Sequence, residues 1–286
     1  GAFGSPSDML ARTLQPKLSE RWGKPVIVEN RTGGAGTVQA LTVAKATPDG
    51  HTLLLISGQF AIGAALRPKA LPYDTLRDFS GVTQIGFSTS ALLVNPSLGV
   101  RTLKEFVELA HARPGKLLFS SGGGGSSTHI SAERFNYAAG IKAVHVGFKG
   151  TPDAILEVLG GRVQYCLVGL GSAIHLVRDG KLIALAVNTP KRTPLLPDVP
   201  AIVELYPSFG IDGSHTIFAP AGTPLAIRTQ ISRDVARVLE LPEVRDRMQE
   251  MAYNVDTSTP QELDAIIREQ IESFREIGKR VGLVES

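Results

Sequence analysis

The 286-residue sequence lacks most of what several protein classes require. It has one cysteine, Cys166, so it can form neither an internal disulfide nor a cysteine-based metal cluster. Cys166 lies in the apolar run "YCLV", which indicates a buried structural thiol rather than a nucleophile. The net charge is only +3, without a Lys/Arg-rich block, which argues against a nucleic-acid partner. No apolar run approaches the length that spans a membrane.

Motifs of common enzyme classes are also missing. Neither glycine-rich loop has the G-x-G-x-x-G spacing of a dinucleotide site, and no Gly-Lys pair is followed by the Ser or Thr of a phosphate-binding loop. There is no G-x-S-x-G elbow and no H-E-x-x-H motif. His129 and His145 each lie near a strand–helix junction, where a structural hydrogen bond is favoured over catalysis. We therefore expect a protein that is not an enzyme and has no metal or cofactor.

What the sequence does contain is a regular alternation of short apolar strands and helical patterns. This alternation predicts an α/β fold with parallel sheets. Residues 1–96 and 102–188 form two similar halves, which indicates two doubly wound lobes with a ligand cleft between them. "PVIVEN" (Pro25–Asn30) is expected to be a buried strand, and the proline-rich Thr189–Pro200 to be irregular.

The stretch "LLFSSGGGGSSTHISAERFN" (Leu117–Asn136) places four glycines between a predicted strand and a predicted helix. Regular flanks favour a tight strand–loop–helix turn over a flexible linker. Glycines let the backbone approach a ligand, and the helix start supplies free N–H groups. Since the loop has hydroxyl residues but no Lys or Arg, it suits a carboxylate better than a phosphate. A capped turn without a ligand is the simpler alternative.

Long stretches of the sequence resemble the periplasmic solute-binding proteins of tripartite tricarboxylate transporters, the Bug family. In the first half these are "KLSERWGKPVIVENRTGGAGTVQALTVAKATPDGHTLLL" and "LPYDTLRDFSGVT". In the second they include "ARPGKLLFSSGGGGSSTHISAERF", "AVHVGFKGTPDAILEVLGGRVQ" and "KRTPLLPDVPAIVE". The resemblance covers nearly the whole chain.

The resemblance implies a Venus-flytrap fold that closes on a small organic carboxylate. Lobe one is expected to comprise residues 1–98 plus 216–286, and lobe two residues 99–215, with hinges at Leu98–Arg101 and Ile211–Thr216. It also implies a monomeric periplasmic protein that delivers its ligand to membrane permease subunits. The chain opens in a loop, so we expect its signal peptide and first strand to precede Gly1.

The resemblance further implies which residues bind the ligand. In the first loop, Gly4 and Ser5 stand where two glycines are usual in the family, and Phe3 where a small residue is usual. The full set of expected ligand-binding residues is Phe3, Gly4, Ser5, Ser7, Asp8, Ser57, Gly58, Gln59, Ser121, Gly122, Gly123, Gly125, Ser126, Thr128, Lys149, Gly150, Thr151, Val168 and Gly169. For Lys149, anion attraction and plain solvent exposure are equally favoured.

One departure from the family bears on the ligand. Family members that take amino acids often have an acidic or amide pair where this chain has Val168 and Gly169, and valine cannot pair with an ammonium group. We therefore expect a ligand without an amino group, with an apolar or aromatic middle that Phe3 and Phe60 contact. Two other readings stay open: a sensor that signals to a membrane kinase, and an α/β enzyme that uses the same cleft.

Overall fold

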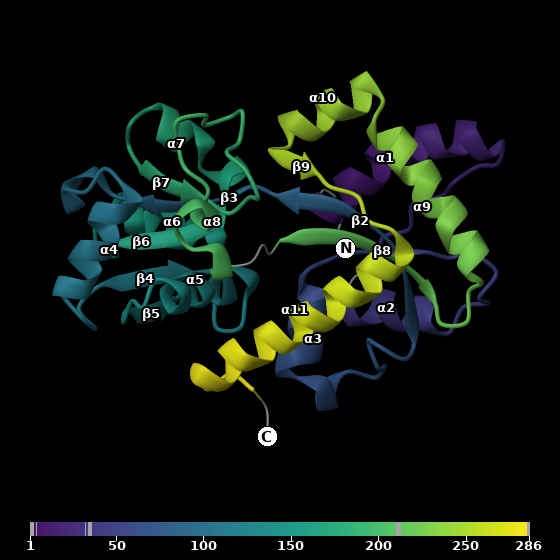
Figure 1. The fold of residues 1–286 in the computed structure, drawn as a ribbon, viewed down its shortest axis with the longest axis horizontal. Coiled ribbons are helices and arrows are strands. Elements are labelled where there is room, and N and C mark those ends of the chain that lie inside the picture. Colours follow the sequence, from purple (N-terminus) through teal and green to yellow (C-terminus); the bar gives the residue numbers. More distant parts are fainter. Residues whose placement is uncertain (1–2, 4, 32, 34–35, 210–212, 285–286) are drawn as a thin grey trace. The chain divides into compact units, whose positions relative to one another are not determined.

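The computed structural model describes residues 3, 5–31, 33, 36–209 and 213–284, and these form two compact units (Figure 1). Unit 1 comprises Gly1–Phe87 and Ser214–Ser286, and unit 2 comprises Ser88–Gly213. The expected boundaries at 98/99 and 215/216 differ from these. The first observed boundary, at 87/88, lies 11 residues before the expected one, because the strand at Ser90–Val94 pairs with strands of unit 2.

Unit 1 is built on a four-stranded sheet with the strand order β1-β8-β2-β9. Strand β8 lies between β1 and β2 and is antiparallel to both. The strands are β1 (Leu54–Ser57), β2 (Phe79–Ser88), β8 (Ser214–Pro220) and β9 (Tyr253–Val255). The α-helices described in this unit are α1 (Pro6–Trp22), α2 (Thr37–Ala44), α3 (Gln59–Leu66), α9 (Leu225–Leu239), α10 (Pro242–Glu250) and α11 (Pro260–Arg280).

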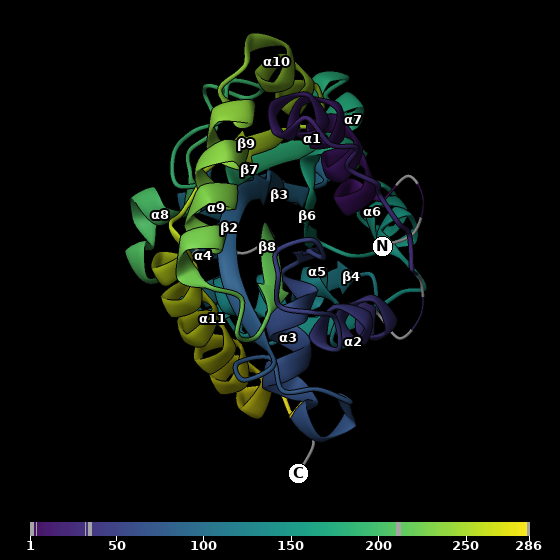
Figure 2. The ribbon, with the colours of Figure 1, turned by 90° about the vertical axis from the view of Figure 1, so that its right-hand side faces the viewer.

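Helices cover both faces of the unit 1 sheet (Figure 2). Apolar residues of α1, α9 and α10, such as Leu14, Val235 and Met248, pack in one cluster with Val82 and Ile217 of the sheet. Elsewhere in the unit, Phe60 of α3 packs against Phe79 and Phe218 of the sheet, and α3 also contacts α11. Burial of this apolar surface is the main term that stabilises the unit.

Unit 2 is built on a five-stranded sheet with the strand order β5-β4-β6-β3-β7. Strand β4 is parallel to β5 and β6, whereas β3 is antiparallel to β6 and β7. The strands are β3 (Ser90–Val94), β4 (Leu118–Ser121), β5 (Val144–Gly147), β6 (Tyr165–Gly169) and β7 (Ile183–Val187). The α-helices described are α4 (Leu103–Ala112), α5 (Ser127–Ala138), α6 (Thr151–Leu159), α7 (Ile174–Arg178) and α8 (Ile202–Leu205).

Strand β3 shows why unit 2 has helices on both faces of its sheet. Successive side chains of a strand point to opposite faces. Leu92 and Val94 join the apolar cluster that contains α4 and α5, whereas Ala91 and Leu93 join the cluster that contains α6. Both faces are therefore buried. The α/β class and the two-unit architecture are confirmed.

Two details of the predicted fold are wrong. Neither sheet is purely parallel. In unit 1 β8 is antiparallel to both of its neighbours, and in unit 2 β3 is antiparallel to β6 and β7, so only the unit 2 sheet contains parallel pairs among those described. Pro25–Asn30 is not a strand, and Ile27 is 78% exposed. Instead, the Val26 N–H donates to Ser19 Oγ at 2.9 Å, and Val26 O accepts from Gln15 Nε2, also at 2.9 Å. Side chains of α1 thus replace a neighbouring strand as partners of this segment.

Two other expectations are met. Residues Thr189–Pro200 contain no helix or strand. Cys166 is fully buried, and burial raises the pKa of its thiol to about 12, so the group is an inert part of the core.

Candidate ligand-binding site

The carboxyl ends of several strands meet at one edge of the unit 2 sheet. Strands β4, β5 and β6 are parallel and end at Ser121, Gly147 and Gly169. Strand β7 runs the same way as β6, because both are antiparallel to β3. This edge, where helices begin after the strands, is where α/β sheets bind ligands.

The glycine loop, Ser121–Thr128, connects β4 to α5 at this edge. Gly123 has a φ of 122° and Gly125 a φ of 73°, values that residues with a side chain rarely adopt. The Ser126 N–H donates to Gly123 O at 3.1 Å, and Ser126 Oγ accepts from the His129 N–H at 3.2 Å. The loop is therefore a tight turn that ends in the N-cap of α5, as predicted, and not a linker.

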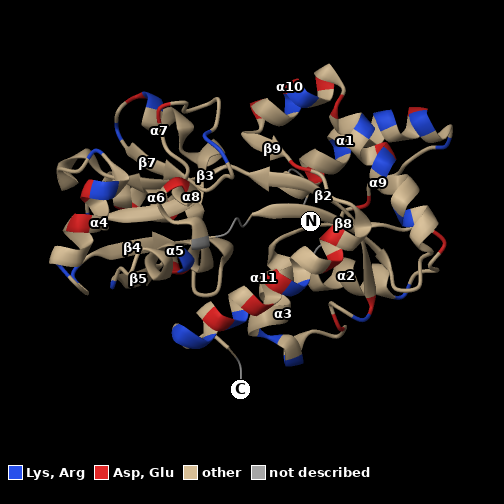
Figure 3. Cartoon of the chain, viewed as in Figure 1, with Lys and Arg blue, Asp and Glu red and all other residues tan. Residues whose placement is uncertain are grey.

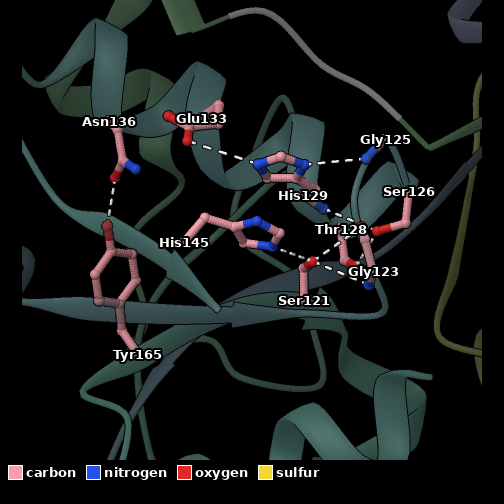
Figure 4. A network of polar contacts seen from close by, with 10 residues as sticks. All are labelled: Ser121, Gly123, Gly125, Ser126, Thr128, His129, Glu133, Asn136, His145 and Tyr165. Atoms are coloured by element: carbon pink, nitrogen blue, oxygen red, sulfur yellow. Dashed lines mark hydrogen bonds and ion pairs between the residues drawn. The ribbon is translucent and has the colours of Figure 1, made fainter. Parts of the chain in front are cut away.

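The loop uses part of its own hydrogen-bonding capacity internally (Figure 4). The Gly122 N–H donates to Thr128 Oγ1 at 2.9 Å, the Gly123 N–H to Ser121 Oγ at 3.1 Å, and the Gly125 N–H to His129 Nδ1 at 3.1 Å. Three backbone donors remain without a partner in the described part of the chain, namely the N–H groups of Gly124, Ser127 and Thr128. Ser127 and Thr128 open a 12-residue helix, whose N-terminus attracts anions.

A second helix start lies against the glycine loop. A Cβ placed on Gly122 would lie 3.4 Å from Thr151 N and 3.5 Å from Thr151 Oγ1. Gly150 is the N-cap of α6, and Thr151 is its first helical residue. The structure thus brings Gly122, Gly150 and Thr151 together, and the amino ends of α5 and α6 flank the same loop.

The exposed Lys149 lies beside this loop and has no ion-pair partner among the described residues. It lines a cavity of about 600 Å³, which is formed by Gly123, Gly124, Gly147, Phe148, Lys149, Asp153, Leu156 and Glu157. Arg162 Nε donates to Glu157 Oε2 at 2.6 Å, and this hydrogen bond, together with the positive charge of Arg162, lowers the pKa of the Glu157 carboxyl. Charge on the glycine loop itself is absent, whereas helices such as α11 carry both signs in alternation (Figure 3).

The predicted residues of unit 1 lie at the start of α1, apart from Gly4, which lies outside the described residues. Ser5 is the N-cap, and its hydroxyl accepts from the Asp8 N–H at 3.3 Å. Ser7 is half-buried in the first turn, and Phe3 is 80% exposed with the Arg12 guanidinium 5.1 Å above its ring. This exposed ring is a cation–π partner of Arg12.

Asp8 is buried and already has partners. Arg12 Nε donates to both carboxylate oxygens, at 3.0 and 3.1 Å, and Asn30 Nδ2 donates to Oδ1 at 2.8 Å. The carboxylate therefore joins the first turns of α1 to the segment that follows that helix. This arrangement gives Asp8 a structural role, in addition to the ligand role that the sequence predicts.

Ser57, Gly58 and Gln59 lie where β1 leads into α3. All three are half-buried, and Ser57 pairs with His215 across the sheet. The side chains of Ser57 and Gln59 make no hydrogen bond to any other described residue. They can therefore offer a hydroxyl and an amide to a ligand.

Two of the predicted contacts are wrong. The Val168 side chain is fully buried and packs in the cluster of Ile155 and Val158 on α6, so no ligand reaches it. Its neighbour Gly169 is half-buried, with open space where a Cβ would lie. Phe60 is 3% exposed and packs edge-on against Phe79 at 5.0 Å, so it belongs to the core of unit 1.

Two buried polar residues at the carboxyl edge of unit 2 were not predicted from the sequence. Asn188 follows β7, and its N–H donates to Ser90 O at 2.8 Å. Thr89 precedes β3, and its carbonyl accepts from the Leu170 N–H at 2.8 Å. Asn188 was recognisable as the first polar residue after the apolar run "LIALAV", whereas the position of Thr89 depends on the antiparallel direction of β3.

Two other kinds of site are missing from the described residues. Among them there is no group of three or more His, Cys, Asp or Glu side chains that could hold a metal ion. None of the helices that the structure describes is long and apolar enough to span a membrane.

Comparison with known proteins places the chain in a family. Residues 10–283 match the family described as "Tripartite tricarboxylate transporter family receptor". A UPF0065 protein of Bordetella bronchiseptica is 31% identical over 96% of this chain and 81% of its own length. The protein BugT of Bordetella pertussis is 30% identical over 98% of this chain and 86% of its own length.

Solved structures agree with this placement. The R. palustris protein Rpa4515, solved with adipate, is 29% identical with a TM-score of 0.77, over 99% of this chain and 95% of its own. MatC from Rhodopseudomonas palustris, solved with bound malate, is also 29% identical, with a TM-score of 0.71 over 96% of this chain and 95% of its own. The predicted family is confirmed, and the chain belongs to the tripartite tricarboxylate transporter receptor family, whose named members include Bug proteins.

Proposed function

We propose that the chain is a periplasmic receptor that captures a small organic carboxylate without an amino group and delivers it to the membrane subunits of a tripartite tricarboxylate-type transporter. The observation that carries this proposal is the neutral donor set of the glycine loop. The N–H groups of Gly124, Ser127 and Thr128 have no partner within the described chain, and Ser127 and Thr128 open the α5 helix. Hydrogen bonds to a charged acceptor contribute about 1.5–3 kcal/mol each, so a few such donors hold a carboxylate.

The strand ends at the same edge support a ligand without an ammonium group. They carry Ser121, Gly147, Gly169 and Asn188, none of which is acidic. An ammonium group beside these four residues would find no carboxylate among them, and the carboxylates of the neighbouring cavity, Asp153 and Glu157, belong to α6. Adipate and malate, bound by the two solved relatives, also lack an amino group. Burial of Phe60 removes one of the two aromatic contacts that favoured a ring in the ligand.

The family name supports the membrane partner, since its members are receptors of a tripartite transporter. Closure of the two units on the ligand, which the family resemblance implies, is part of the proposal. Small-angle scattering with and without ligand tests closure, and an unchanged radius of gyration at saturation would contradict it.

A thermal-shift panel of adipate, malate, an aromatic dicarboxylate and glutamate tests the ligand class. A ligand that binds the native state raises the melting temperature, and at one hundred times its Kd it stabilises by about 2.7 kcal/mol. We expect a shift with at least one dicarboxylate and none with glutamate. A shift with glutamate alone would overturn the ligand class, and no shift at all would overturn the proposal.

Two N-cap variants locate the site within unit 2. Ser126 caps α5 at the glycine loop, and Thr102 caps α4 through a bond from the Glu105 N–H at 3.2 Å. Ser126→Ala and Thr102→Ala should each lower stability by about 1 kcal/mol. Only Ser126→Ala should also weaken dicarboxylate binding, by about tenfold or more, measured by calorimetry. Equal affinities in the two variants would place the ligand elsewhere.

A further inference from the structure

Two histidines lie face to face directly behind the glycine loop. His129, in the first turn of α5, and His145, on β5, have ring centroids 3.6 Å apart and an interplanar angle of 10°. Phe119 of β4 packs beside both rings, with centroids at 6.0 and 5.0 Å. His129 is 5% exposed. Figure 4 shows that each ring directs one nitrogen towards the loop.

Each imidazole is linked by hydrogen bonds to a backbone amide of the loop, one directly and one through the Ser121 hydroxyl. The Gly125 N–H donates to His129 Nδ1 at 3.1 Å, so Nδ1 must be unprotonated and the proton must lie on Nε2. His129 Nε2 faces Glu133 Oε1 at 3.7 Å. His145 Nε2 lies 2.6 Å from Ser121 Oγ, and that hydroxyl accepts from the Gly123 N–H at 3.1 Å.

We propose that His129 and His145 are paired positioning residues, which hold the glycine loop in the conformation that leaves the Gly124, Ser127 and Thr128 N–H groups for a ligand carboxylate. This inference rests on the proposed ligand role of the loop. Neither imidazole needs to touch the ligand. One orients the Gly125 amide directly, and the other orients the Gly123 amide through Ser121.

The pair works only while both rings are neutral. An imidazolium at His129 has no lone pair to accept the Gly125 N–H, and two cations 3.6 Å apart repel each other. The titratable groups that face the rings are Glu133 on α5 and, beyond Phe119, the neutral Tyr165 phenol on β6, which donates to Asn136 Oδ1. Burial, and then the unfavourable interaction with a protonated His129, lower the pKa of His145 to about 4, against the opposing effect of Glu133. The fold therefore keeps this ring neutral at neutral pH.

Two substitutions of His129 distinguish the contribution of its hydrogen-bond acceptor, Nδ1, from that of its aromatic ring. His129→Asn places an amide oxygen two bonds from Cβ, as Nδ1 is, whereas His129→Phe keeps the ring and removes the acceptor. We expect His129→Phe to weaken adipate binding about two- to tenfold at neutral pH, the effect of one net hydrogen bond, and His129→Asn to stay within about twofold of wild type. The exposed His175 of α7 supplies the control variant His175→Gln. Wild-type affinity in His129→Phe, or equal losses in the Asn and Phe variants, would overturn the proposal.

Amide exchange and ring titration in the full-length protein test the positioning role without any ligand. The Gly125 amide should exchange slowly in wild type and His129→Asn and at least about tenfold faster in His129→Phe. The Gly123 amide resonance, which is linked to His145 through Ser121, should move on acidification with the midpoint of the His145 ring and be unaffected by His175. If no carboxylate binds wild type, the proposed function fails while these readouts still decide the positioning role. Equal Gly125 exchange in wild type and His129→Phe would overturn it.

Discussion

His215 is a buried imidazole in unit 1 whose protonation the fold opposes. It lies on β8 and is 4% exposed, with the Tyr253 ring 5.6 Å away. Its Nδ1 atom has no hydrogen-bond partner within the described chain. Burial lowers the pKa of His215 to about 4. In the unfolded chain His215 begins to bind a proton as the pH drops towards 6.5. In the folded protein the side chain stays neutral until the pH approaches about 4.

The stability of unit 1 should consequently decrease as the pH is lowered. Between pH 6.5 and about 4 the unfolded chain binds a proton at His215 that the folded chain does not, so the free energy of unfolding decreases as pH falls. The expected loss from this residue is about 3 kcal/mol between pH 7 and pH 4. Urea unfolding followed by the fluorescence of Trp22, the single tryptophan and a residue of unit 1, measures it.

Carboxylates also titrate in this range, so the comparison is with His215→Gln, which cannot be protonated. The variant should lose less stability than wild type on acidification, even if it is less stable at pH 7. Parallel losses in the two proteins would show that His215 does not carry the effect.

At the scale of elements, Gly86 marks a place where two strands of unit 1 are very close. Its φ is 140°, and a Cβ at this position would lie 1.9 Å from Asn254 O on β9. Ile85, the residue of β2 before Gly86, accepts a hydrogen bond at 3.1 Å from the N–H of Asp256, which directly follows β9. A side chain at residue 86 would therefore force β9 away from β2.

Gly86→Ala should destabilise unit 1 by about 2–4 kcal/mol, because it combines a steric clash with an unfavourable φ. The matched control is Gly63→Ala in α3, where the nearest atoms to a Cβ are those of Leu71 at 3.9 Å. That variant should be neutral or more stable by up to about 1 kcal/mol, since alanine favours a helix. Urea midpoints from Trp22 fluorescence give both values, and equal midpoints would refute the expectation.

Sequence patterns predicted the elements whose partners are local. The strand, loop and helix at Leu117–Asn136 were expected and are present, because strand, turn and cap signals all lie within 20 residues. The pattern did not identify β2, whose ten residues are mostly buried and contain Gly81 and Gly86. Its partner β8 lies about 130 residues further along the chain, so nothing local specifies the pairing.

The same limit explains which site residues were predictable. The glycine loop is fixed by its own residues, so its turn and N-cap could be predicted. Whether Val168 faces the core, or Asn188 shares an edge with Ser121, depends on the strand order of the sheet. One residue of register decides which face a strand side chain reaches, and this register is set by distant strands.

At the scale of the whole molecule, unit 2 is one continuous segment inserted into unit 1. Its two ends meet, since the Ser88 N–H donates to Gly213 O at 3.3 Å. It has its own apolar clusters on both faces of its sheet. A segment with a complete core and adjacent ends has the features of an independent domain.

The excised segment 88–213 should therefore fold alone and unfold cooperatively in urea, followed by far-ultraviolet circular dichroism. Residues 1–87 alone serve as the contrasting case, because β1 and β2 both pair with β8, which they lack. We expect that fragment to show no cooperative transition. A disordered 88–213 segment, or a cooperatively folded 1–87 fragment, would contradict this assignment of units.

The position of β8 between β1 and β2 also sets an order of events during synthesis. When residue 213 has emerged from the ribosome, unit 2 has all the strands described in its sheet. Residues 1–87 still lack β8, the strand that pairs with both β1 and β2. The insert can therefore complete its fold before its host, reversing the usual N-terminal-first order. Until β8 arrives, the edges of β1 and β2 are open to wrong partners, so the early part of the chain is the part that most needs a chaperone.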